Sequence, residues 1–202
     1  MLCMGCTKLK EYPTFFDVPD SLFLSRWQDD EGWSGKLLQP LIVYGLPCEG
    51  GDKYEYNINV NVDSTLSGMD LASDIDYQGV PCTDGIGFFP NGNIRGTQLA
   101  HDYQRGEAQW ESGTSIDFHE NGKVRNGTLG DDLALPHHDL QLHAGNEIDF
   151  YPSGNIQHIR VTDEGIRFRG LDFELYNLYF CEDGSFDYME EMYISNAGEI
   201  YW

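Results

Sequence analysis

The sequence contains four copies of one short segment, and this internal repetition constrains the fold more than any other feature. Each copy has an aliphatic residue, an aromatic residue two positions later and a glycine four positions after that. The copies span residues 86–94, 116–124, 148–156 and 178–186. Their glycines, Gly92, Gly122, Gly154 and Gly184, follow one another at steps of 30, 32 and 30 residues.

The residue types in each copy predict a β-hairpin. The aliphatic and the aromatic residue lie on the same face of a strand, because side chains alternate between faces. Pro90 and Pro152 suit the first corner of a type I turn. The glycine that follows can adopt the left-handed conformation that closes a three-residue loop with a bulge. The return strands are then expected to begin at Ile94, Val124, Ile156 and Phe186.

Two further marks recur with the hairpin. An acidic residue lies three positions after an aliphatic one, giving the column Asp74, Asp102, Asp132 and Glu164. Gly45-Leu-Pro-Cys48 resembles Gly79-Val-Pro-Cys82, and Gly113 and Gly145 take the corresponding later places. Each unit is therefore expected to contain a strand, a tight turn, a second strand, an acidic corner, a third short strand and a glycine connection. Five units are expected over residues 51–202, preceded by an abbreviated unit that ends at Cys48.

The turn segments resemble the Tyr-Tyr-x-Asn-Gly-Lys-Leu hairpin of MORN-variant repeats. The resemblance is carried by Phe89-Pro-Asn-Gly-Asn-Ile94, Phe118-His-Glu-Asn-Gly-Lys-Val124 and Phe150-Tyr-Pro-Ser-Gly-Asn-Ile156. It covers about ten residues of each unit, and the spacing of 30 to 32 residues is longer than that of MORN arrays. The resemblance implies a sheet of stacked hairpins that serves as an interaction platform. A distinct but similar repeat family is the alternative.

The repeats predict an all-β fold, either an elongated twisted antiparallel sheet or a solenoid-like array of stacked β-hairpins with a period of about 30 residues. Residues 1–44 differ in composition and are expected to form an N-terminal cap with a partial repeat, and residues 45–202 the hairpin array. The last residues, 200–202, are expected to cap the other end, because an open edge of a repeat array needs a cover.

The net charge narrows the classes of partner. The chain has 34 Asp and Glu against 12 Lys and Arg, a formal charge of −22. Such a field repels phosphate backbones, so neither nucleic-acid nor anionic-membrane binding is expected. No apolar stretch is long enough for membrane insertion or resembles a signal peptide, so a cytoplasmic location is expected. The acidic residues form either a solvated surface that maintains solubility or a face for a basic partner or for mimicry of a polyanion.

The cysteines and histidines are the candidate reactive groups. Cys3 and Cys6 have the spacing of a zinc knuckle but no further ligand nearby, and the five cysteines are expected to be reduced. Cys48 and Cys82 share one repeat position and are expected to be buried. The densest ligand-type cluster is His137, His138 and His143, which is either a group of surface histidines or a transition-metal or catalytic site.

The acidic column also has two interpretations. Carboxylates at corners accept hydrogen bonds from turn amides, whereas a ladder of calcium ligands would need several oxygen donors in each unit. Neither a nucleophile elbow nor a phosphate-binding loop is present in the sequence. No catalytic, cofactor-binding or metal-binding residue is therefore assigned.

The function predicted from these features is that of a non-enzymatic binding or scaffold protein. Repeats specify extended surfaces, and here an acidic repeat surface would engage a protein partner, for which a basic protein is the natural complement. The first alternative is an inhibitor or immunity-type protein that blocks a basic partner. The second is a metal-dependent hydrolase that uses His137, His138 and His143.

Overall fold

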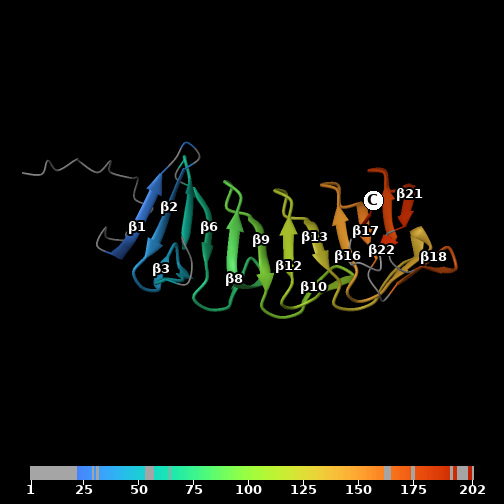
Figure 1. The fold of residues 1–202 in the computed structure, drawn as a ribbon, viewed down its shortest axis with the longest axis horizontal. Coiled ribbons are helices and arrows are strands. Elements are labelled where there is room, and N and C mark those ends of the chain that lie inside the picture. The colour runs from blue at the N-terminus through green and yellow to red at the C-terminus, as the bar shows by residue number, and fades with distance from the viewer. Residues whose placement is uncertain are drawn as a thin grey trace, which may run out of the picture. The chain divides into compact units, whose positions relative to one another are not determined.

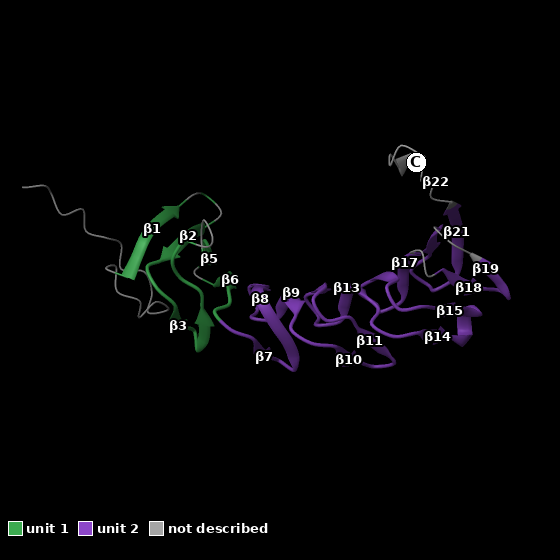
Figure 2. Ribbon diagram, turned by 60° about the horizontal axis from the view of Figure 1, so that its bottom comes forward, with its two compact units in different colours: residues 1–72 green, residues 73–202 purple. Residues whose placement is uncertain are grey.

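The computed structural model describes residues 22–28, 30, 32–52, 57–63, 65–161, 165–173, 176–191, 193–194 and 200–201. The chain divides into two compact units, residues 1–72 and 73–202 (Figure 2). The boundary expected between residues 44 and 45 stays a prediction. Most of the expected N-terminal cap, and Trp202 at the other end, lie outside the described residues.

The fold is all-β, as predicted. Across the described ranges there is no α-helix, and none of these residues forms a helix with the length and apolar character needed to cross a membrane. The first unit contains β1 (Phe23–Gln28), β2 (Gly32–Leu37), β3 (Leu41–Val43), β4 (Leu46–Cys48), β5 (Ile58–Asn61) and β6 (Leu66–Asp70). Its antiparallel sheet has the order β1-β2-β5-β6, and β3 and β4 form a separate hairpin.

The second unit is built on a large antiparallel sheet of long strands in the order β8-β9-β12-β13-β16-β17-β20-β21 (Figure 1). These strands are β8 (Val80–Phe88), β9 (Ile94–Leu99), β12 (Ser115–Phe118), β13 (Val124–Thr128), β16 (Glu147–Phe150), β17 (Ile156–Arg160), β20 (Tyr176–Phe180) and β21 (Phe186–Glu191). A small hairpin of β22 (Tyr193–Ile194) and β23 (Ile200–Tyr201) follows.

The four predicted turns lie at the upper ends of the long strands in Figure 1. Gly92, Gly122, Gly154 and Gly184 have φ of 83°, 80°, 93° and 85°. Each glycine N–H donates to the carbonyl three residues earlier, at 2.8 to 2.9 Å. The strand register shifts just before each turn, as in a bulged hairpin. The hairpin prediction is therefore confirmed at all four positions.

Short strands form a second layer against the long ones. They are β7 (Ile75–Tyr77), which pairs with the start of β8, β10 (Tyr103–Arg105), β11 (Ala108–Trp110), β14 (Leu133–Leu135), β15 (Leu140–Leu142), β18 (Ile166–Phe168) and β19 (Leu171–Phe173). The prediction of one short strand after each acidic corner was wrong, because a two-stranded hairpin follows it. Two-residue turns with positive φ, such as Gln78-Gly79 and Arg169-Gly170, let such short strands fold back.

The core of the second unit lies between these two layers. Ile116, Phe118 and Ile148 point inward from the long strands and are 0%, 1% and 0% exposed. Trp110 of β11 packs edge-on against the Phe150 ring, with centroids 6.1 Å apart. A Cβ added at Gly127 would lie 2.7 Å from the Trp110 ring, so a glycine at this position lets the indole approach β13. Burial of each such side chain contributes about 1.5–3 kcal/mol.

Candidate functional site

A row of negative charge in the second unit lies where the long strands connect to the short hairpins, at the lower ends of the strands in Figure 1. Six exposed carboxylates line these connections, and we call them the acidic edge: Asp74, Asp84, Asp102, Glu111, Asp131 and Asp132. The connecting segments 73–74, 83–85, 100–102, 111–114, 130–132 and 143–146 contain no Lys or Arg. The acidic edge is therefore a row of negative charge without a neighbouring strong cation in its own segments.

The backbone fixes the position of these connections. The N–H of Gly113 donates to Leu99 O at 2.8 Å, and the N–H of Gly145 donates to Leu129 O at 2.7 Å. Both glycines have positive φ, 76° and 86°, as the predicted glycine connections require. Asp84 has a φ of 60° at the corresponding place inside β8, where the strand register shifts between Thr83 and Ile86.

Three carboxylates of the acidic edge join the outgoing and returning chain of one connection. Asp102 Oδ1 accepts the N–H of Ser112 at 3.0 Å, and Asp132 Oδ1 accepts the N–H of Ala144 at 3.2 Å. Asp74 Oδ1 accepts the Thr83 hydroxyl at 2.6 Å. The interpretation of the corner carboxylates as acceptors of backbone amides is confirmed for Asp102 and Asp132. The fourth member of the predicted column, Glu164, lies outside the described residues.

Sequence reasoning missed the other half of the acidic edge. Asp84 and Glu111 lie in the returning connections, and Asp131 precedes the column residue Asp132. A usable signal was present, because Asp84 directly precedes Gly85 and Glu111 lies two residues before Gly113. The glycines indicate the connections, whereas the predicted acidic column contains only residues at one fixed distance from the turn glycines.

The predicted histidine cluster is not brought together. His137 and His138 lie in the 3-10 turn η2 (Pro136–His138), at the tip of the β14–β15 hairpin. The Leu133–Leu142 pair marks the other end of that hairpin, and His143 follows it. His143 Nδ1 lies 3.2 Å from Asp132 Oδ2, whereas the His138 ring packs edge-on against Phe180 at 5.3 Å. The two ends of the hairpin therefore have separate local roles.

No group of three or more His, Cys, Asp or Glu side chains that could hold a metal ion is found within the described ranges. The carboxylates of the acidic edge belong to successive connections. Three of them, Asp74, Asp102 and Asp132, accept hydrogen bonds within their own connection.

The outer face of the long strands carries ion pairs between arginine and carboxylate side chains. Arg125 contacts Asp117 at 2.8 Å, and Arg160 contacts Glu147 at 2.7 Å.

An Asp–His pair lies in the same outer face. Asp149 Oδ2 is 2.9 Å from His158 Nδ1, and Asp149 Oδ1 accepts the Asn126 amide at 2.8 Å. The second ring nitrogen of His158 lies 3.0 Å from Asn177 Oδ1. Burial raises the pKa of Asp149, but the hydrogen bonds from His158 and Asn126 outweigh it and hold the pKa below its usual value. Both imidazole nitrogens are occupied by these partners, so the pair has the character of a structural link between strands.

The cysteines are placed for packing rather than for chemistry. Cys48 and Cys82 are both 0% exposed, as predicted from their shared repeat position. Burial raises the pKa of the Cys48 thiol to about 12 and also raises that of Cys82, which keeps both thiols protonated. Cys3 and Cys6 lie outside the described residues.

Comparisons of this chain with protein-family models, with curated proteins and with solved structures give no match.

Proposed function

We propose that this chain is a non-enzymatic binding protein that engages a basic macromolecular partner along the acidic edge of its second unit. The observation that carries the proposal is the row of six exposed carboxylates in connections that contain no Lys or Arg. A net charge of −22 adds a long-range field that accelerates the encounter with a cationic protein and disfavours polyanions.

The hairpin repetition gives the proposed surface its spacing. Successive hairpins advance by two strands, and strands lie about 4.8 Å apart, so equivalent carboxylates recur at roughly 10 Å. That interval is close to the Debye length of about 8–10 Å at physiological salt. A partner with Lys or Arg side chains at a similar interval, on a helix or an extended segment, would be its complement. In this proposal the protein is a repeat array similar to MORN-variant proteins, supported by four turns of one geometry.

The test compares the wild type with two triple variants of equal charge. Asp84→Asn/Glu111→Gln/Asp131→Asn neutralises the edge and leaves the linking residues Asp74, Asp102 and Asp132 in place; asparagine tolerates the positive φ at residue 84. Glu120→Gln/Asp172→Asn/Glu182→Gln removes the same charge from other exposed positions of the second unit. Each protein is immobilised and exposed to lysate of its source, and retained proteins are identified by mass spectrometry.

We expect the wild type and the control variant to retain the same basic protein, and the edge variant to lose most of it. The association rate with that purified protein should fall several-fold as salt rises from about 50 to about 300 mM, because the added ions screen the attraction between the exposed charges. Equal loss in both variants, or a retained partner that is not basic, would contradict the proposal. An inhibitor or immunity-type protein would use the same edge, and adding it to the purified partner would abolish that partner's activity.

A further inference from the structure

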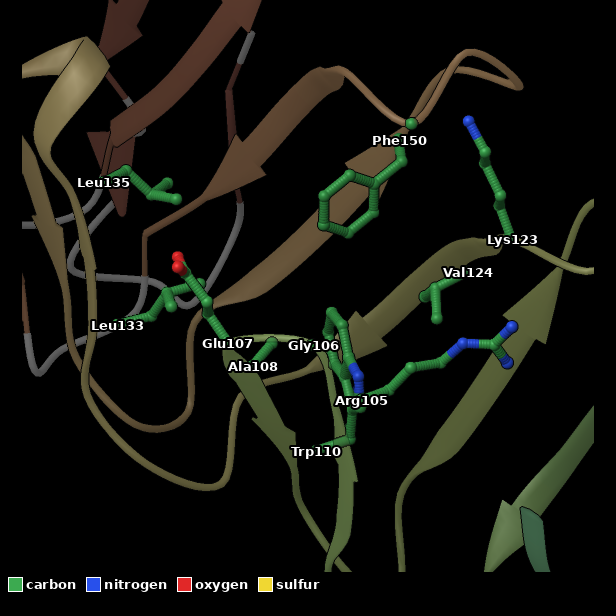
Figure 3. Close-up of a pocket in the computed structure, with 11 residues that line it drawn as sticks. Arg105, Gly106, Glu107, Ala108, Trp110, Lys123, Val124, Leu133, Leu135 and Phe150 are labelled. Atoms are coloured by element: carbon green, nitrogen blue, oxygen red, sulfur yellow. The ribbon is translucent and has the colours of Figure 1, made fainter. Parts of the chain in front are cut away.

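A pocket of about 350 Å³ opens in the second unit between the two layers of strands (Figure 3). It lies where the second layer is interrupted, because β10 and β11 form an isolated hairpin while β14, β15, β18 and β19 form a continuous sheet. The pocket is lined by Ala108 and Trp110 of β11, by Leu133 and Leu135 of β14, and by Val124 and Phe150 of the long strands.

The gap in the second layer arises because the tips of the short hairpins do not all meet the same turn relative to their place in the chain. Gln78 Nε2 donates to Gly92 O at 3.1 Å, and Arg105 donates to Gly122 O at 2.6 Å, so these two hairpins each meet the next turn along the chain. The β14–β15 tip instead reaches the fourth turn, where the His138 ring lies 3.9 Å from the Cβ position of Gly184. The third turn, at Gly154, therefore borders the pocket.

The lining of the pocket is mostly apolar, with two cationic side chains on one side. Figure 3 shows Arg105 and Lys123 on one side of the pocket and Glu107 on the other. No carboxylate within the described ranges forms an ion pair with Arg105 or Lys123: Arg105 donates to Gly122 O and to the Tyr103 hydroxyl, and Lys123 donates to Ser153 O. Each side chain has further donors available, because a guanidinium and an ammonium carry more N–H groups than these contacts use.

The floor contains an unpaired donor. The Trp110 side chain is 2% exposed, and its indole nitrogen has no hydrogen-bond partner. A buried donor left without an acceptor costs about 1–3 kcal/mol. Arg105 and Lys123 also place two positive charges at this pocket, in a chain with 34 acidic and 12 basic residues. The two cations favour an occupant that supplies negative charge, and the apolar lining of Trp110, Val124 and Phe150 favours one with an apolar body.

We propose that this pocket binds a small anionic aromatic molecule, whose anionic group contacts Arg105 and Lys123 and whose apolar body lies against Trp110, Val124 and Phe150. The volume is in the range of about 300–1,000 Å³ that holds small organic ligands, and a mostly apolar lining with a few polar groups is typical of such sites. The site differs from the acidic edge in position and in the sign of its charge. It therefore does not depend on the function proposed above.

The test uses the fluorescent anion anilinonaphthalene sulfonate and its uncharged analogue N-phenylnaphthylamine. The double variant Arg105→Gln/Lys123→Gln removes the pocket cations. The matched control Arg95→Gln/Arg125→Gln removes two exposed arginines of β9 and β13 that do not line the pocket. A third variant, Leu135→Trp, fills the pocket from β14, and circular dichroism checks that each variant is folded.

We expect the wild type and the control to bind the anion at one site with equal affinity, and the pocket double variant to bind it about tenfold more weakly, the loss of about one charge-assisted hydrogen bond. Affinity for the uncharged analogue should change less than about twofold in both variants, since its binding rests on apolar contact. A folded Leu135→Trp protein should lose both probes. Absence of one-site binding of the anion by the wild type, unchanged affinity in the pocket variant, or equal loss in the control would overturn the proposal.

Discussion

The substitution Gly122→Val tests the turn geometry on which the whole arrangement of hairpins depends. Gly122 has a φ of 80°, and a Cβ added there would have no atom within 4 Å. The cost of a side chain is therefore backbone strain and not collision. A β-branched residue at positive φ is among the least tolerated, and we expect Gly122→Val to lower the free energy of unfolding by about 1–3 kcal/mol.

The same turn also supports the hairpin layer beneath it. The carbonyl of Gly122 accepts the Arg105 guanidinium at 2.6 Å, so a change in backbone conformation that relieved the strain would also disturb this hydrogen bond. For a domain of this size the loss corresponds to a fall in Tm of roughly 2–4 °C per kcal/mol. Thermal melts followed by circular dichroism in the β-sheet region would measure it.

Gly122→Asn is the matched control, because asparagine adopts positive φ far more readily than valine. We expect it to recover most of the loss. If the Gly122→Val protein melts with the wild type, residue 122 does not occupy the left-handed position of the turn. If asparagine and valine are equally harmful, the cost has a source other than φ, and the reasoning from strain is refuted.

Two further predictions concern titratable groups. The pKa of Asp149 is lowered in the folded protein, so its ionised form stabilises the fold above the ordinary Asp pKa of about 4, and this contribution is lost as the pH falls through the lower folded value. The difference in Tm between wild type and Asp149→Asn should therefore shrink as the pH is lowered from 6 to about 3, and a constant difference would refute the assignment. Cys48, with its pKa raised to about 12, should resist iodoacetamide at pH 8 until the protein is unfolded in urea; rapid modification of the native protein, located by mass spectrometry, would show that this thiol is accessible.

The hairpins of the long strands could be predicted from the sequence because their chemistry is local. Proline at the first corner and glycine at the left-handed position fix one turn type, and the inward aliphatic and aromatic residues fix the register. Ile116 and Phe118 illustrate the point, since both lie in the predicted strand and both are buried.

The second layer was harder to predict, because its strands are only three residues long, which is too short for an alternation of apolar and polar residues to identify a strand. Its turns place Gln78 and Arg169 at positive φ before a glycine, and the β3–β4 hairpin of the first unit does the same with Tyr44. Asn-Gly and Asp-Gly are the usual signals of such turns, and these three residues are not among those that favour this conformation. The sequence therefore carries no local signal for these turns.

The acidic edge was half predicted for a related reason. A column at constant spacing found Asp102 and Asp132, because each lies at the same distance from a turn glycine. Asp84 and Glu111 reach the same edge from the returning half of the connection, and their proximity follows from the antiparallel path of the short hairpins. The carboxylates of the outgoing and the returning segments come side by side only when the short hairpin brings the chain back.

The pocket has its origin in the irregular step of the repeat. The steps between turn glycines are 30, 32 and 30 residues, and the longer step contains the β14–β15 hairpin. Its strands are joined by the four residues 136–139, whereas β10–β11 and β18–β19 are joined by two residues each. The longer loop contains η2 (Pro136–His138) and carries His138 to the fourth turn, which leaves the space below the third turn open to Lys123 and Phe150. Shortening the loop to a two-residue Asn-Gly turn should let the tip meet the third turn, and we then expect the pocket to close and the affinity for anilinonaphthalene sulfonate to fall. A shortened, folded protein that bound the anion as the wild type does would show that the longer loop is not what keeps the pocket open.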